Sequence, residues 1–159
     1  MIIKQIVDEN FQDYKKASMF IVTPTCDFKC LKEQNLDISI CQNSSLTDMP
    51  DIDISANRIV NRYLSNPITS AIVIGGLEPF LQFNELLELV DEFRLVTGDD
   101  IVIYTGYNLE EIEDEVSILS RYENIIIKFG RYLINSEPIY DEVLGVTLAS
   151  NNQYAVKIS

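Results

Sequence analysis

The strongest constraint on the fold is a regular alternation of short Ile/Val-rich runs with amphipathic segments. Each apolar run is continuous, which is typical of strands that are buried on both faces of a parallel sheet. The segments between the runs carry apolar residues at helical spacing, so each is expected to be a helix that crosses over the sheet. The sequence therefore predicts an α/β fold with a mostly parallel sheet, with strands at 18–23, 70–76, 101–106 and 124–130 and helices at 55–64, 84–96 and 108–121.

Residues at the segment ends refine this pattern. Ser55, Asn84 and Asn108 stand where the N-caps of the three helices are expected. Residues 154–158 are expected to add a last strand, and residues 1–7 an edge strand whose direction the sequence leaves open.

Two irregular stretches, 24–54 and 129–153, are longer than the connections of most compact domains. Both follow predicted strands, so both leave the sheet at its carboxyl edge, where α/β proteins build their binding sites. No repeat, low-complexity tract or interdomain linker interrupts the 159 residues, which indicates a single domain over 1–159. A functional site is therefore expected at the carboxyl edge of the sheet.

Charge and composition exclude several classes of function. The 25 acidic and 12 basic residues give a net charge of −13, which repels nucleic acid and anionic membrane surfaces. No run approaches the roughly 18 apolar residues of a membrane span. Acidic residues at the start replace the apolar run of a signal peptide, so we expect a cytoplasmic protein. The absence of histidine excludes Ser/His/Asp and Cys/His catalysis and mixed Cys/His zinc sites.

The loop 24–54 contains every cysteine of the chain: Cys26, Cys30 and Cys41. A structural disulfide is not expected in a cytoplasmic chain, and incidental cysteines would be scattered, mostly in the core. A zinc site would need a carboxylate as its fourth ligand, which is uncommon for structural zinc; the candidates are Asp27, Glu33 and Asp37. Three thiolates can instead hold three irons of a cubane iron–sulfur cluster and leave the fourth iron open for chemistry, and the clustering favours this interpretation.

Two short motifs within this loop resemble a known family. CDFKC at 26–30 matches the first half of the Cys-x3-Cys-x2-Cys motif of radical S-adenosylmethionine enzymes. CQN at 41–43 is similar to the third cysteine of that motif with the x-Asn that often follows it in activases. Over about residues 16–158 the chain resembles the activating proteins of anaerobic ribonucleoside-triphosphate reductase. The resemblance implies a [4Fe-4S] cluster bound by Cys26, Cys30 and Cys41, and S-adenosylmethionine as a second cofactor.

The spacing of the cysteines departs from the family motif. Ten residues, 31–40, separate Cys30 from Cys41, and Glu33 stands where the third cysteine is usual. Either this segment is an insertion that leads away from the cluster, or the loop has stopped binding one; a retained third thiol followed by x-Asn favours the insertion. We expect no cluster ligand from the segment. Three of its apolar residues alternate with polar ones, as in a half-buried strand or a partner contact: Leu36, Ile38 and Ile40.

Later strand ends resemble cofactor-binding segments of the same family. IVIGGLEPF at 72–80 resembles its Gly-Gly-Glu-Pro motif with Leu77 inserted, YTGYNLEEI at 104–112 its Thr-Gly-Tyr stretch, and GVTLASNNQ at 145–153 its late Gly-Ser-x-Asn-Gln segment. Simple turns and helix caps are the alternative interpretation of each. The resemblance implies that the following residues contact S-adenosylmethionine: Gly75, Gly76, Glu78, Pro79, Tyr104, Thr105, Gly106 and Asn152, with Gln153 and Tyr107 as further candidates.

One strand end differs from the family. In IIIKFGRY at 125–132, Lys128 and Phe129 replace the acidic residue that activases carry there. The role of that acidic residue is therefore not carried over to this chain.

The resemblance implies an open, partial (β/α)6 barrel and the function of a radical S-adenosylmethionine activase. A flavodoxin- or ferredoxin-like donor would reduce the cluster, and S-adenosylmethionine would be cleaved to methionine and a 5′-deoxyadenosyl radical. That radical would take a hydrogen atom from a glycine of a glycyl radical enzyme, an anaerobic ribonucleoside-triphosphate reductase. Two alternatives remain: a non-catalytic interaction subunit of the same fold, and a radical enzyme that acts on another peptide or small substrate.

Overall fold

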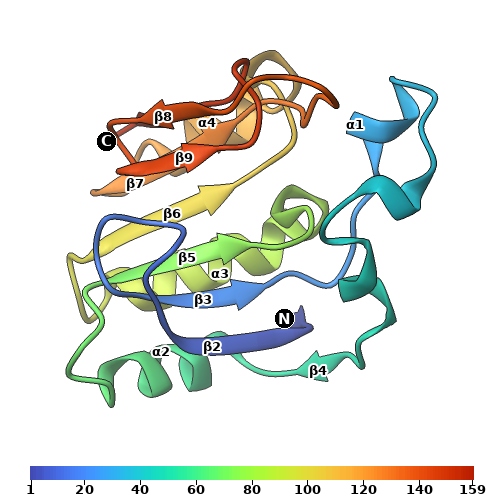
Figure 1. Ribbon diagram of the computed structural model, residues 1–159. Helices are drawn as coiled ribbons and strands as arrows, with labels where there is room; N and C mark the ends of the chain where they lie inside the picture. The colour runs from blue at the N-terminus through green and yellow to red at the C-terminus, as the bar shows by residue number, and fades with distance from the viewer.

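The computed structural model describes residues 1–159, and a six-stranded open sheet in the order β10-β7-β6-β5-β3-β2 forms its centre (Figure 1). Four neighbouring strands run parallel: β3 (Ser18–Val22), β5 (Ala71–Gly75), β6 (Asp100–Tyr104) and β7 (Ile125–Phe129). An antiparallel strand lies at each edge: β2 (Gln5–Asn10) beside β3, and β10 (Tyr154–Lys157) beside β7. The predicted α/β class with a mostly parallel sheet is therefore confirmed.

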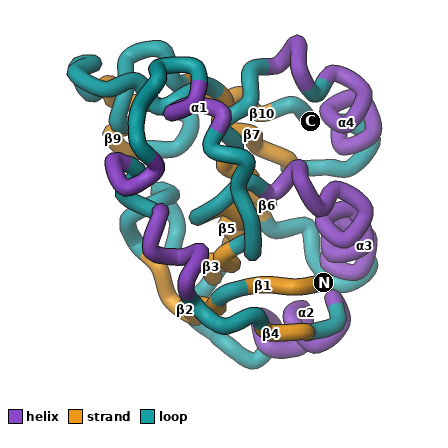
Figure 2. Tube along the Cα trace, turned by 90° about the vertical axis from the view of Figure 1, so that its right-hand side faces the viewer, coloured by secondary structure: helices purple, strands orange, loops and turns teal.

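Three helices cover one face of this sheet (Figure 2): α2 (Ala56–Leu64), α3 (Phe83–Arg94) and α4 (Glu113–Leu119). Each helix connects two parallel strands that are neighbours in the sheet, as expected of crossover connections. The apolar sides of the helices pack against alternate residues of the central strands: Ile72, Ile74, Ile101, Ile103, Ile125 and Ile127.

The opposite face is covered by the segment before β3 and by a hairpin of β8 (Ile139–Asp141) and β9 (Val146–Leu148). Here Tyr14, Leu144 and Leu148 pack against the other set of alternate strand residues: Ala71, Val73, Val102 and Ile126. Side chains of a strand alternate between its two faces, so the central strands are buried on both sides. This double burial explains why their sequences are continuous apolar runs.

The long loop after β3 contains only short elements. They are α1 (Lys29–Lys32), 3-10 turns at Ile38–Ile40 and Ser44–Asp48, and β4 (Ile52–Asp53), which pairs with β1 (Ile2–Ile3). Two more 3-10 turns, Pro79–Gln82 and Leu109–Glu111, precede α3 and α4. Residues 31–40 thus form helical turns and connecting chain, and the prediction of a half-buried strand in this segment is wrong.

One of the three predicted helix caps is confirmed: the Ser55 hydroxyl accepts a hydrogen bond from the Arg58 N–H at 3.4 Å. Asn108 precedes the 3-10 turn Leu109–Glu111 instead, where its N–H donates to the Glu111 carboxylate at 2.8 Å, and Ile112 is the residue before α4. Asn84 is not a cap, because the 3-10 turn at Pro79–Gln82 runs directly into α3 and places Asn84 inside the helix.

The open sheet is consistent with part of the predicted barrel. Its four parallel strands and three crossover helices match the strand–helix repeat, while a (β/α)6 barrel stays a prediction. None of the helices has the length and apolar character of a membrane span.

Candidate functional site

The predicted site residues gather at the carboxyl ends of the parallel strands, where the loop that carries α1 lies (Figure 1). The start of this loop is joined to the end of β5. The backbone N–H and hydroxyl of Thr23 donate to the Gly75 carbonyl at 2.9 and 3.0 Å. The Glu78 N–H donates to the Thr25 carbonyl at 2.8 Å. The cysteine loop therefore begins from a fixed position on the sheet.

The three thiols lie around one small apolar cluster. Cys26, Cys30 and Cys41 pack against three buried side chains, Phe28, Leu31 and Leu77. They also line one cavity of about 180 Å³, which we call the thiol cavity. No group of three or more Cys, Asp or Glu side chains is arranged to hold a single metal ion. In a [4Fe-4S] cluster each thiolate binds a separate iron, so thiols that share one cavity without converging on a single point can hold such a cluster.

Cys26 and Cys41 share the same local geometry. In each case the backbone N–H two residues further on donates to the sulfur, from Phe28 to Cys26 at 3.3 Å and from Asn43 to Cys41 at 3.4 Å. Hydrogen bonds of this kind stabilise cluster-bound thiolates and tune the reduction potential. The shared geometry suits Cys41 to the role of the third ligand.

Burial opposes the ionisation of two thiols in the cluster-free protein. Desolvation is the main cause that raises the pKa of Cys26 to about 12, and the hydrogen bond from Phe28 offsets part of this effect. Desolvation also raises the pKa of Cys30, and the nearby charge of Cys41 adds to it. Iron binds the thiolate, so cluster assembly must release these protons.

Asn43 joins the third cysteine to the turn after β5. Its Nδ2 donates to the Gly76 carbonyl at 2.7 Å. Gly76 has a φ of +82°, and a Cβ at this position would lie 2.9 Å from Val22 Cγ1 and 3.3 Å from Leu46 Cδ1. Backbone conformation and packing therefore require this glycine, whether or not it also contacts a ligand.

Replacing Gly76 with alanine should lower the free energy of unfolding by about 1–3 kcal/mol, because the new Cβ is strained by both φ and contact. Gly98→Ala is the matched control: a Cβ there meets no atom within 4 Å, and the change should be neutral or slightly stabilising. Urea denaturation followed by circular dichroism measures both variants. Equal unfolding free energies for the two would contradict the requirement at residue 76.

Glu78 is a buried carboxylate that ties the ends of β5 and β6 together. Its Oε1 accepts from the Phe80 N–H at 3.2 Å and the Thr105 hydroxyl at 2.8 Å, and its Oε2 accepts from the Gly106 N–H at 2.9 Å. Burial is the main cause that raises the pKa of Glu78, and these three donors oppose the shift. Much of its acceptor capacity is thus used within the protein, where it orients Thr105 and Gly106.

The structure brings most predicted cofactor residues to the thiol cavity: Gly76, Glu78, Tyr104, Thr105 and Gly106 line it. Three others do not. Gly75 ends β5 within the sheet, and Pro79 is buried in the turn before α3. Asn152 is exposed, and its Nδ2 donates to the Arg131 carbonyl at 2.9 Å. Its neighbour Gln153, the other candidate of that segment, is buried and lines the cavity.

Tyr107, a further candidate, faces the cysteine loop. Its hydroxyl donates to the Asp27 carboxylate at 2.8 Å, and the Arg131 guanidinium lies 5.6 Å from the centre of its ring. Asp27 is therefore bound to Tyr107, next to the first cysteine.

Lys128 is a functional candidate that the sequence did not reveal beyond its replacement of an acidic residue. It is 7% exposed, and its Nζ donates to the Thr105 carbonyl at 3.3 Å and the Gly130 carbonyl at 3.1 Å. Burial lowers the pKa of this amine to about 8. The sequence signal that could have indicated Lys128 is its position as a single basic residue inside an otherwise apolar strand.

Arg131 is the second candidate that was missed, and it holds the first half of the cysteine loop. Its Nε and Nη2 donate to the Glu33 carboxylate at 2.9 and 3.1 Å, its Nη2 to Glu111 at 2.6 Å, and its Nη1 to the Gly106 carbonyl at 2.5 Å. Lys29 also pairs with Glu111. We call these four side chains, Arg131, Glu33, Glu111 and Lys29, the Arg131 clamp.

The clamp defines the role of Glu33. Its hydrogen bonds with Arg131 are the main cause that lowers the pKa of Glu33, and Arg131 likewise lowers the pKa of Glu111 to about 2. Glu33 is thus an ion-pair partner at the position where the family motif has a cysteine. That residues 31–40 provide no cluster ligand stays a prediction.

Comparison with known proteins agrees with this chemistry. A family model described as a 4Fe-4S single cluster domain matches residues 15–152, a range that includes all three cysteines and the four parallel strands. No curated protein and no solved structure matches the chain. Three half-buried thiols around one cavity, two of them with N–H donors, are a donor set that fits such a cluster.

Proposed function

Because this chain belongs to the 4Fe-4S single cluster domain family, we propose that Cys26, Cys30 and Cys41 hold one [4Fe-4S] cluster and that the protein is a radical S-adenosylmethionine enzyme. The observation that carries the proposal is that all three thiols line the same cavity as five of the eight predicted cofactor residues. Three thiolates leave one of the four irons without a protein ligand. S-adenosylmethionine requires such a free position.

In this proposal the strand ends bind and orient S-adenosylmethionine beside the thiols. Gly76 and Gly106 lack side chains, so a ligand can approach their backbone closely. Tyr104 offers an aromatic ring and Gln153 an amide. Buried apolar side chains beneath the thiols limit the access of water. A reduced cluster would supply the electron that cleaves the sulfonium to methionine and a 5′-deoxyadenosyl radical.

The partner in this proposal is a glycyl radical enzyme, an anaerobic ribonucleoside-triphosphate reductase, with a flavodoxin- or ferredoxin-like electron donor. The support is the resemblance of the strand-end motifs at 75–79 and 104–107 to those of activases. The absence of histidine agrees with it, because abstraction of a hydrogen atom requires no side-chain acid or base.

Anaerobic reconstitution with iron and sulfide, followed by dithionite and S-adenosylmethionine, tests the proposal. We expect 5′-deoxyadenosine and methionine in equal amounts from the native chain, and at least about 100-fold less from Cys30→Ser, because serine is a poor ligand for iron in a sulfide cluster. A cluster without cleavage would support the non-catalytic interaction subunit instead. Cleavage without a glycyl radical signal on a co-purified reductase would favour a different substrate.

A further inference from the structure

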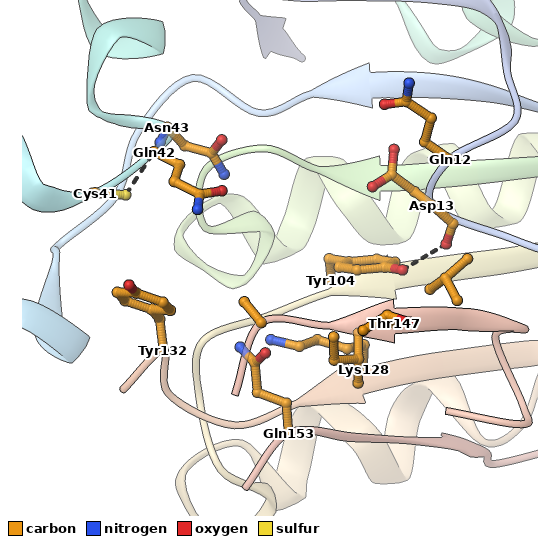
Figure 3. A pocket seen from close by; sticks show the side chains of 13 residues that line it. Gln12, Asp13, Cys41, Gln42, Asn43, Tyr104, Lys128, Tyr132, Thr147 and Gln153 are labelled. Carbon is orange, nitrogen blue, oxygen red and sulfur yellow. Dashed lines mark hydrogen bonds between the residues drawn. The ribbon is translucent and has the colours of Figure 1, made fainter. Parts of the chain in front are cut away.

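The two tyrosines of the 104–107 segment face different parts of the site. Tyr104 lines the thiol cavity and an adjoining cavity of about 350 Å³, where its hydroxyl donates to the Asp13 carbonyl at 2.5 Å (Figure 3). Tyr107 lines neither of these cavities, and its hydroxyl donates instead to Asp27, the residue after the first cysteine. Tyr107 therefore acts on the cysteine loop rather than on what the two cavities hold.

The turn that follows Cys26 has a strained backbone. Phe28 has a φ of +52°, in the left-handed region. The other non-glycine residues with a positive φ are all asparagines, which tolerate this conformation well: Asn35, Asn124 and Asn135. Phenylalanine lacks this tolerance, and a strained residue persists only where its surroundings fix it. Contacts around Phe28 must therefore hold the turn.

The strained turn arranges two of the cysteines. The Phe28 N–H donates to the Cys26 sulfur at 3.3 Å, and the Phe28 carbonyl accepts from the N–H groups of Leu31 and Lys32 at 3.0 Å. The first contact orients Cys26, and the other two form the start of α1, which carries Cys30. Release of the turn would therefore disturb both thiols.

The Asp27 carboxylate holds this turn with both of its oxygens. Its Oδ1 accepts from the Lys29 N–H at 3.1 Å, which closes the turn across Phe28. Its Oδ2 accepts from the Tyr107 hydroxyl at 2.8 Å. The second bond prevents the carboxylate from rotating away from the Lys29 N–H, so the turn depends on Tyr107.

Tyr107 is itself fixed on the sheet. Its N–H donates to the Thr105 hydroxyl at 3.0 Å, and its carbonyl accepts from the Gly130 N–H at 3.0 Å, which holds it between the ends of β6 and β7. Two cations, Lys29 and Arg131, lie 5.5 and 5.6 Å from the centre of its ring. The bond to Asp27 thus attaches the first turn of the cysteine loop to a rigid support.

We propose that Tyr107 is a positioning residue for the cluster: by holding Asp27 it keeps the turn 26–29 in the conformation that directs the Phe28 N–H to the Cys26 sulfur. The inference rests on the cluster of the proposed function and does not depend on the cleavage of S-adenosylmethionine. A hydrogen bond to a cluster-bound thiolate stabilises the reduced, more negative state of the cluster. Loss of the Tyr107 hydroxyl therefore makes the cluster harder to reduce.

Tyr107→Phe tests the proposal in two measurements. In the cluster-free protein, we expect iodoacetamide to alkylate Cys26 at least about fivefold faster than in the native chain, the factor that corresponds to the loss of one hydrogen bond. Peptide mass spectrometry gives this rate. In the cluster-loaded protein, spectroelectrochemical titration should give a lower midpoint potential, which a loss of stability alone would not produce.

Tyr122→Phe is the matched control. The Tyr122 hydroxyl also donates to a carboxylate, that of Asp91, at 2.6 Å, but this bond joins α3 to the segment after α4 and has no contact with the cysteine loop. The control removes the same atom and the same kind of bond. It should match the native chain in both the alkylation rate and the midpoint potential.

Variants of Asp27 show whether Tyr107 acts through this carboxylate. Asp27→Asn should keep the native alkylation rate, because an amide oxygen can accept from the Lys29 N–H while the amide nitrogen donates to the Tyr107 hydroxyl. Asp27→Ala should expose Cys26. Adding Tyr107→Phe to Asp27→Ala should then have no further effect, because the bond is already lost.

A native alkylation rate of Cys26 in Tyr107→Phe, or a native midpoint potential, would show that the proposal is wrong. A further increase in alkylation when Tyr107→Phe is added to Asp27→Ala would also contradict it. The alkylation measurement requires no cluster. A native chain that binds no cluster would therefore refute the proposed function separately, whatever the alkylation rates show.

Discussion

Cys41→Ser should reduce the iron bound after anaerobic reconstitution from about four per chain to below about one, with loss of the visible cluster absorption. Serine keeps the size of the side chain but replaces a soft thiolate by a hard, weakly acidic hydroxyl. The backbone N–H of Asn43, which donates to the Cys41 sulfur, would then have no thiolate to stabilise. Iron and acid-labile sulfide analyses measure the outcome.

Ser45→Ala is the control for this prediction. Ser45 is exposed in the same loop, four residues after Cys41, and its hydroxyl makes no hydrogen bond to the cluster region. It should retain the iron content of the native chain. Full iron content in Cys41→Ser would show that Cys41 is not the third ligand, and Glu33→Gln would then be the next variant to assay.

Arg131→Met should slow cluster assembly at least about tenfold and lower the free energy of unfolding by about 2 kcal/mol. The change removes the bonds from Arg131 to Glu33 and Glu111 and leaves both carboxylates without their main partner. The turn that carries Cys30 then loses part of its attachment to the ends of β6 and β7, while the Lys29–Glu111 pair and the hydrogen bond from Gln34 to the Tyr132 carbonyl remain. Cluster absorbance during reconstitution gives the rate, and alkylation of the cluster-free protein reports how exposed Cys30 becomes.

Arg94→Met is the control that distinguishes a general loss of stability from a loss of positioning of the turn that carries Cys30. Arg94 makes four hydrogen bonds to backbone carbonyls of the Thr97–Asp99 and Glu123–Asn124 segments, close to the amino ends of β6 and β7. This variant should be destabilised to a similar extent but should assemble its cluster at the native rate. Native assembly and native Cys30 alkylation in Arg131→Met would contradict a positioning role for the clamp.

The sheet could be predicted from the sequence because its signals are local. Each central strand is a continuous apolar run buried on two faces, and each crossover helix has an apolar stripe. The start of α3 was misplaced because Pro79–Gln82 forms a 3-10 turn that continues into the helix, and no local signal marks that junction.

The site was only partly predictable because its key contacts join distant segments. The clustering of the cysteines in one loop indicates a site, and the glycines at 75–79 indicate the turn after β5. The Arg131–Glu33 pair joins residues 98 positions apart, and no local pattern indicates which of the 25 acidic residues Arg131 would bind. Lys128 is conspicuous only once its buried side chain is seen to line a cavity at the carboxyl edge of the sheet.

The clamp also changes the entropy of closing the cysteine loop. Ten residues between Cys30 and Cys41, compared with two in the family motif, increase the entropic cost of closing a flexible loop by about 1.4 kcal/mol. Glu33 is fixed by Arg131, and the Gln34 amide donates to the Tyr132 carbonyl at 2.7 Å. Only residues 35–40 then remain to be ordered when Cys41 meets the other two thiols, so these two contacts lower the entropic cost of closing the lengthened loop by about 0.5 kcal/mol.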